Sequence, residues 1–151
     1  MKKELEQKLF DAFPNLYADK DADLKTSLIP MGIETGDGWF QLIWDLSEKL
    51  EKIIIQWKEK NPGEENFPRA AQVKEKFASL RFYFTDYLEE FDSLVIEAER
   101  KSEITCEVCG GVGEIMTNGH WLKTLCSEHA VYKRHWGGES IYKPLPKKKQ
   151  K

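Results

Sequence analysis

The arrangement of the cysteines constrains this chain most. Cys106 and Cys109 are separated by two residues, and after a further sixteen residues Cys126 and His129 repeat that spacing. Zinc prefers thiolate sulfur and imidazole nitrogen in a closed tetrahedral site, and two such pairs let two tight turns grip one ion. The sequence therefore predicts one structural Zn²⁺ per chain, bound by these four side chains.

Two other histidines could take the place of His129 in this site. His120 and His135 lie close to Cys126 in the sequence, but their spacing from it is less regular. We assign the fourth ligand to His129 and keep the other two as alternatives.

The residues around the ligands predict a treble-clef-like zinc finger. The glycines at 110–111 suit a zinc knuckle, where the backbone approaches the metal. Strands at 114–117 and 120–124 flank Asn118-Gly119, a dipeptide typical of a two-residue type I′ turn. A helix is expected over 127–134, so that the second ligand pair lies at its start.

Upstream, a long amphipathic helix is predicted over residues 39–60. Asp37 is the expected N-cap, and Asn61-Pro62-Gly63 ends the helix. Apolar residues recur every three or four positions and form one face that we expect to nucleate the core: Trp39, Leu42, Ile43, Leu46, Leu50, Ile53, Ile54 and Trp57.

The segment 71–84 shows the two-residue alternation of a β-hairpin with its turn at Ala78-Ser79. That turn lacks residues that readily take positive φ, so a helix through 73–80 is the alternative. A helix beginning at Thr85 or Asp86 should then lead into the zinc knuckle.

At the N-terminal end, a short helix should end at Pro14, and residues 28–31 are interpreted as an edge strand. The predicted fold is α+β. Residues 1–102 are expected to form a small, mainly helical body that includes the hairpin. Residues 103–136 are expected to form the zinc finger, and residues 137–151 are expected to form a flexible basic tail.

Charge is distributed unevenly along the chain. The whole sequence carries a net −3, but residues 131–151 hold seven basic residues and one acid, a net of +6 that leaves −9 for residues 1–130. Such a basic end is typical of a nucleic-acid contact, because lysine and arginine side chains that neutralise phosphates supply affinity for nucleic acid of any base sequence. The residues nominated for this contact are Lys123, Lys133, Arg134, Lys147, Lys148 and Lys149.

A second binding hypothesis concerns the helix start near residue 38. Backbone N–H groups at a helix N-terminus can hold an anion. Outward-facing side chains of the predicted hairpin could complete a pocket there for a small nucleotide. The candidates for this pocket are Asp37, Trp39, Arg81 and Tyr83. The sequence contains no apolar run long enough to span a membrane and no signal-peptide pattern, so the cytoplasm is the expected compartment.

Catalysis is not expected. A metal-dependent nuclease can be built on a treble clef, with His120 as base and His135 as a ligand, but the sequence lacks a convincing set of further ligands. Four zinc ligands also leave no open coordination position.

Three segments resemble a loosely defined group of small, mostly uncharacterised proteins of bacteriophages and prophages. They are residues 31–39, residues 72–83, and the Cys106–His129 finger with Trp121 and Thr124-Leu125-Cys126. The resemblance spans roughly residues 30–130, and the group has glycine where this chain has Ala78. It implies an accessory role in a bacterial host but no established biochemical activity, so no catalytic residue is carried over from it. We therefore expect a non-catalytic protein that binds a host or phage protein or nucleic acid, or alternatively sequesters a nucleotide signal used in host defence.

Overall fold

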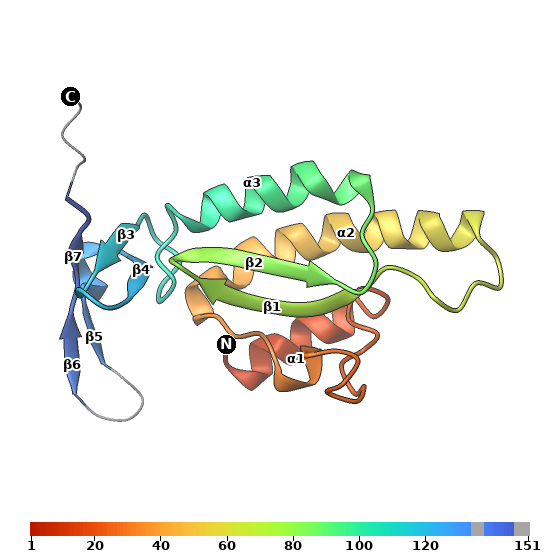
Figure 1. Cartoon of the computed structure of the whole chain (residues 1–151), viewed down its shortest axis with the longest axis horizontal. Helices are drawn as coiled ribbons and strands as arrows, with labels where there is room; N and C mark the ends of the chain where they lie inside the picture. The colour runs from red at the N-terminus through yellow and green to blue at the C-terminus, as the bar shows by residue number, and fades with distance from the viewer. Residues whose placement is uncertain (134–137, 147–151) are drawn as a thin grey trace.

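The computed structural model describes residues 1–133 and 138–146. Its helices are α1 (Lys3–Ala12), α2 (Phe40–Lys60) and α3 (Asp92–Ser102), with short 3-10 turns at Ile29–Met31, Asp37–Trp39, Glu89–Phe91 and Ser127–His129. Its strands are β1 (Ala70–Lys76), β2 (Ser79–Phe84), β3 (Glu114–Thr117), β4 (Leu122–Leu125), β5 (Val131–Lys133), β6 (Glu139–Ile141) and β7 (Lys143–Pro144). The predicted α+β fold with a C-terminal Cys/His module is confirmed (Figure 1).

The long helix α2 is the centre of the body, as its apolar stripe predicts. Ile43, Leu46, Leu50 and Ile54 are buried, and burying each such side chain contributes about 1.5–3 kcal/mol. On the same helix, the buried Glu51 carboxylate accepts hydrogen bonds from the backbone N–H groups of Asn15 and Leu16. Helix α2 thereby fixes the loop that follows α1.

The β1–β2 hairpin is confirmed, and the alternative helix through 73–80 is wrong. Lys76 pairs with Ser79, which leaves Phe77 and Ala78 as a two-residue turn one position earlier than predicted. Both turn residues have positive φ, 55° and 64°, the left-handed conformation that a type I′ turn requires. The outer edge of β1 is covered, since Glu34 N–H donates to the Val73 carbonyl at 3.0 Å.

Three local predictions in the body need correction. Residues 29–31 form a 3-10 turn and not an edge strand. Asp37 does not cap α2; its carboxylate accepts the Lys2 N–H at 2.8 Å and pairs with the Lys2 ammonium. Helix α3 begins at Asp92, after a 3-10 turn, rather than at Thr85 or Asp86.

The C-terminal module is larger and richer in strands than the sequence suggests. The helix expected over 127–134 is wrong, because β5 follows one 3-10 turn and pairs with β6. β7 pairs with β3 to give a sheet in the order β4-β3-β7. The tail predicted to begin at residue 137 therefore includes two strands, and Tyr142 between them is buried.

The β3–β4 connection also differs from the predicted type I′ turn. It is a four-residue loop, 118–121, between the paired Thr117 and Leu122. The Asn118 side-chain oxygen closes this loop by accepting the backbone N–H groups of His120 and Trp121 at 3.0 and 2.8 Å.

Two hydrophobic clusters hold the chain together. The larger lies among the three helices and the β1–β2 hairpin, and the smaller contains Cys106, Met116, Leu125 and Tyr142 within the module. The turn of the β1–β2 hairpin points toward the module and meets it (Figure 1). Within the described residues, no helix has the length and apolar character needed to cross a membrane.

Candidate metal centre

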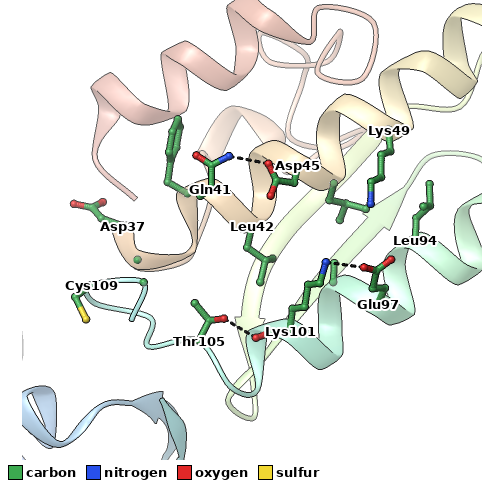
Figure 2. Close-up of a pocket in the computed structure, with 15 residues that line it drawn as sticks. Asp37, Gln41, Leu42, Asp45, Lys49, Leu94, Glu97, Lys101, Thr105 and Cys109 are labelled. Atoms are coloured by element: carbon green, nitrogen blue, oxygen red, sulfur yellow. Dashed lines mark hydrogen bonds and ion pairs between the residues drawn. The ribbon is translucent and has the colours of Figure 1, made fainter. Parts of the chain in front are cut away.

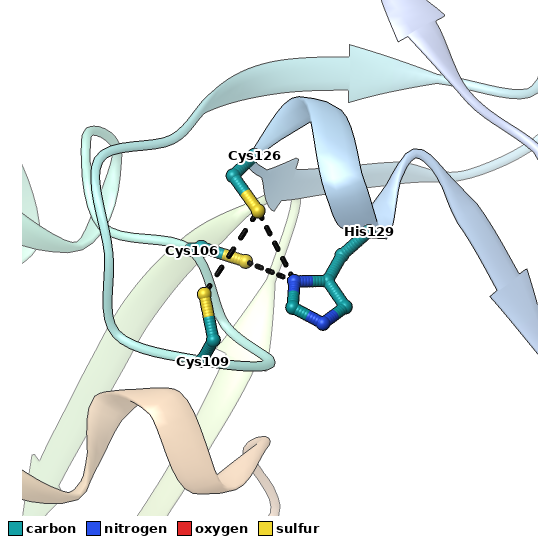
Figure 3. A group of neighbouring side chains, drawn as sticks. All are labelled: Cys106, Cys109, Cys126 and His129. Atoms are coloured by element: carbon teal, nitrogen blue, oxygen red, sulfur yellow. Dashed lines mark hydrogen bonds between the residues drawn. The ribbon is translucent and has the colours of Figure 1, made fainter.

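Cys106, Cys109, Cys126 and His129 converge on one point, with Nδ1 of the histidine directed at the sulfurs (Figure 3). Their ligand atoms all lie within 4.8 Å of one another. The Cys109 and Cys126 sulfurs are 3.8 Å apart, and His129 Nδ1 lies 3.1 Å from the Cys126 sulfur and 3.6 Å from the Cys106 sulfur.

The 3.8 and 3.6 Å separations match those around a tetrahedral ion, and the 3.1 Å separation between His129 Nδ1 and the Cys126 sulfur is shorter. With Zn–S of about 2.3 Å and Zn–N of about 2.0–2.1 Å, two sulfurs lie about 3.8 Å apart and a sulfur and a nitrogen about 3.6 Å apart. The cluster can hold a metal ion such as zinc. His120 is exposed in the β3–β4 loop and is not part of the cluster, whereas His135 lies outside the described residues.

The surroundings shift the pKa values of two of the thiols in opposite directions. Burial acts to raise the pKa of the Cys106 thiol, but backbone N–H groups, chiefly those of Cys109 and Cys126, outweigh burial and lower that pKa. The N–H of Gly111 acts to lower the pKa of the Cys109 thiol, but burial and the neighbouring sulfurs raise it overall. A divalent cation would relieve this repulsion between neighbouring sulfurs, which is a second reason that the cluster fits a metal.

Short-range backbone bonds position the two ligand pairs. In the knuckle, Cys106 N–H donates to the Gly111 carbonyl at 2.7 Å, and Gly110 N–H donates to the Cys106 carbonyl at 2.8 Å. In the second pair, His129 N–H donates to the Cys126 carbonyl at 3.1 Å, and this single 3-10 turn replaces the predicted helix start. One turn is enough to bring the imidazole beside the Cys126 sulfur.

The knuckle is docked against the segment that leads into α2. Glu107, between the two knuckle cysteines, accepts Gly36 N–H through its carboxylate at 3.0 Å and Gly38 N–H through its carbonyl at 2.9 Å. The Trp39 indole N–H donates to the Thr105 carbonyl at 2.8 Å. The metal centre is therefore joined to the body through three hydrogen bonds at the start of α2.

Close backbone contact explains the Gly36-Asp37-Gly38 sequence. A Cβ at Gly36 would collide with the Glu107 carbonyl oxygen, and one at Gly38 would collide with the Cys106 carbonyl oxygen and the Gly110 nitrogen. Gly110 has φ +77°, and a Cβ there would lie 2.8 Å from the Gly38 carbonyl oxygen. Only glycine at these positions lets the two backbones approach so closely.

A second attachment joins the module to the β1–β2 hairpin. The buried Thr124 hydroxyl donates to the Ala78 carbonyl at 2.7 Å. The Lys123 ammonium lies 2.7 Å from the Glu107 carboxylate and 3.8 Å from that of Glu75. Sequence reasoning misses Glu107 and Thr124, because their partners lie 71 and 46 residues away.

The nucleotide pocket expected from Asp37, Trp39, Arg81 and Tyr83 is not assembled. Trp39 is completely buried, and the Glu107 carboxylate already occupies the N–H of Gly36. Arg81 is held by the Ser79 hydroxyl at 2.9 Å and lies 3.5 Å from the Glu99 carboxylate. The anion that the sequence predicts at this helix start is the chain's own Glu107.

The residues nominated for nucleic-acid contact fall into three groups. Lys123 is largely enclosed by its two carboxylate neighbours. The backbone of Lys133 lies in β5. The remaining nominated residues, Arg134, Lys147, Lys148 and Lys149, lie outside the described residues.

A cleft of about 580 Å³ lies between α2, α3 and the knuckle that contains Cys109 and Gly110. Figure 2 shows Lys49, Lys101 and Glu97 side by side on its wall, with Leu42 on the α2 side. Glu97 pairs with the Lys101 ammonium at 2.6 Å, and Asp45 accepts the Gln41 amide at 2.7 Å. Most of the charged groups in the cleft therefore already have partners within it.

Comparison with known proteins gives no relative from which a role can be transferred. The chain matches no protein-family model, no curated protein and no solved structure.

Proposed function

We propose that this protein is a non-catalytic binding protein, in which a structural Zn²⁺ builds the surface that contacts a macromolecular partner, either nucleic acid or another protein. The observation that carries the proposal is the metal centre itself. Three thiolates and one imidazole at these positions would complete a tetrahedral shell around Zn²⁺, and such a shell has no coordination position for a substrate or a reactive water.

The position of the centre supports a structural role for the ion. The knuckle contacts the start of α2 through Glu107, and the adjoining strand β4 contacts the β1–β2 turn through Thr124. A bound ion would hold two turns of the chain in the geometry that these contacts need. Zinc in such modules contributes folding free energy on the order of 10 kcal/mol.

The resemblance to small phage and prophage proteins supports an accessory role in the cytoplasm of a bacterial host. Such a role is exerted by contact with a component of the infected cell. The uneven charge supports the zinc-bearing end as the contact surface, because residues 131–151 carry a net +6 against −9 for the rest of the chain.

The test begins with the metal. Protein purified in reducing, chelator-free buffer should contain about one zinc per chain, and Cys109→Ser should release it. Absence of stoichiometric zinc from folded, reduced protein would refute the structural role.

The second step identifies the partner. Tagged wild-type protein and Cys109→Ser are purified in parallel from the native host, and bound protein and nucleic acid are determined by mass spectrometry and by absorbance at 260 and 280 nm. A partner that is enriched with the wild type and lost with Cys109→Ser supports the proposal. Recovery of no macromolecule above an untagged control would contradict it.

A small nucleotide is the second candidate ligand, now in the cleft between α2 and α3. The favouring observation is a volume of about 580 Å³ with the Lys49 side chain on the wall beside the Lys101–Glu97 pair, since ligand sites span roughly 300–1,000 Å³. Nucleotide-dependent thermal stabilisation that is lost in Lys49→Gln and kept in Lys52→Gln, a change on an exposed position of the same helix, would favour this candidate.

A further inference from the structure

Two exposed aromatic side chains face one hollow at the zinc-bearing end of the molecule. Phe77 is 69% exposed at the β1–β2 turn, and Trp121 is 65% exposed in the β3–β4 loop. Both line a hollow of about 440 Å³, together with Glu75, Lys76, His120 and Leu122. Packing within the chain does not account for two large rings left in solvent at the tips of adjacent hairpins.

Turn chemistry does not account for Phe77 either. The residue has φ 55°, and asparagine, aspartate or glycine adopts this left-handed conformation at lower cost than phenylalanine. The ring is therefore kept at a position where the backbone disfavours it and the core does not need it. A contact outside the chain would account for its presence.

Both rings stand on firmly held supports. The Ala78 carbonyl, next to Phe77, accepts the buried Thr124 hydroxyl, and Ala78 N–H donates to the Glu75 carboxylate at 2.7 Å. The backbone of Trp121 is tied to the Asn118 side chain at 2.8 Å. Such rigid platforms bind planar groups at low cost in conformational entropy.

The charges beside the hollow favour an anionic occupant. The Lys76 ammonium lies 5.5 Å from the centre of the Phe77 ring. Lys143 does not line the hollow, but it is exposed on β7, two strands from the Leu122 that does, in the sheet order β4-β3-β7. Among the described residues that line the hollow, Glu75 is the one acid, and its carboxylate is turned to the Ala78 N–H at 2.7 Å and lies 3.8 Å from the Lys123 ammonium, which Glu107 shares.

We infer that this hollow is a base-stacking surface for single-stranded nucleic acid. Phe77 and Trp121 stack on unpaired bases, while Lys76 and Lys143 contact the phosphates. Unpaired bases expose their faces to such rings, whereas a duplex keeps its bases stacked on each other. The inference rests on the proposed binding function and names the class of partner.

The test measures fluorescence anisotropy of a labelled oligothymidylate of about 15 nucleotides at about 50 and 200 mM salt, with zinc-loaded protein. Phe77→Asn removes the ring and places a residue that suits positive φ, so it should fold at least as well as the wild type. Trp121→Ala removes the second ring. Val112→Ala is the matched control, because Val112 is 89% exposed in the module but does not line the hollow.

The expected result is that each aromatic substitution weakens binding by about tenfold or more, and that Val112→Ala changes it by less than about twofold. A duplex of equal length should bind more weakly than the single strand. Thermal melting and zinc content of each variant establish that it remains folded and metallated.

Two results would overturn the inference, and they bear differently on the proposed function. Salt-sensitive binding that neither Phe77→Asn nor Trp121→Ala weakens would eliminate stacking but keep a nucleic-acid partner. No binding to the oligonucleotide at about 50 mM salt would eliminate the nucleic-acid surface. The purification from the native host then decides whether a protein partner exists, and a protein lost on Trp121→Ala would assign this hollow to it.

Discussion

The most informative stability experiment removes the carboxylate that joins the metal centre to the body. Glu107 is 5% exposed, and its two carboxylate oxygens accept hydrogen bonds from Gly36 N–H at 3.0 Å and from the Lys123 ammonium at 2.7 Å. Glu107→Ala deletes both contacts and leaves the Gly36 N–H without this acceptor. The change therefore tests whether this attachment contributes to the stability of the whole chain.

The magnitude follows from the two contacts. Hydrogen bonds to charged groups contribute about 1.5–3 kcal/mol each, so that two give about 3–6 kcal/mol. Lys123 keeps the Glu75 carboxylate at 3.8 Å, which recovers part of the loss. We expect Glu107→Ala to lower the free energy of unfolding by about 3–4 kcal/mol.

The assay is urea unfolding of zinc-loaded protein under reducing conditions, followed by tryptophan fluorescence and circular dichroism. Glu107→Gln should cost about half as much as Glu107→Ala, because the amide oxygen can still accept Gly36 N–H while the charge facing Lys123 is lost. Glu103→Ala, at an exposed position on the same segment, should cost less than about 0.5 kcal/mol. If Glu107→Ala costs no more than Glu103→Ala, the carboxylate is not an anchor and the reasoning is refuted.

Three further outcomes are expected. In a competition with a chelator, His129→Ala should lose zinc at a lower chelator concentration than His120→Ala, and equal loss would contradict the ligand assignment. Leu46→Ala should cost about 2–5 kcal/mol of unfolding free energy and Glu48→Ala less than about 0.5, since only Leu46 is buried; urea melts check both. Burial raises the pKa of Glu75, so the protonated carboxyl contributes stability that is fully present below the usual glutamate pKa and is lost as the pH rises through the raised pKa. Glu75→Gln should therefore be more stable relative to wild type at pH 8 than at pH 5. A difference that stays constant between these pH values would show that Glu75 does not titrate in this way.

Elements with a strong local pattern could be predicted from the sequence. The stripe that includes Ile43, Leu46 and Leu50 predicts α2 almost to the residue, because 3.6-residue periodicity depends only on near neighbours. The clustering of Cys106, Cys109, Cys126 and His129 could be predicted for a similar reason, since two pairs at fixed spacing favour one shared site. Strand alternation likewise predicts the β1–β2 hairpin.

Elements that depend on distant partners could not be predicted. The local pattern after Ser127 indicates a helix, but Val131 pairs with Ile141, a contact that local propensity does not contain. The pattern of the first hairpin indicates a turn at Ala78-Ser79, whereas the observed turn uses Phe77 and Ala78, which both lack the usual preference for positive φ. Tertiary contacts at Ala78 override that preference, notably the hydrogen bond from Thr124.

At the Gly36-Asp37-Gly38 segment the sequence predicts an anion correctly but assigns it to the wrong source. Glycines and free N–H groups before a helix do predict an anion, and the structure supplies one from within the chain, the Glu107 carboxylate. The same glycines allow the close contact with Gly110 in the knuckle. The metal centre and the start of α2 therefore share one packed backbone contact, so a change that distorts the knuckle must also disturb the first turn of the helix at the centre of the body. We expect the module and the body to unfold as one cooperative unit for this reason.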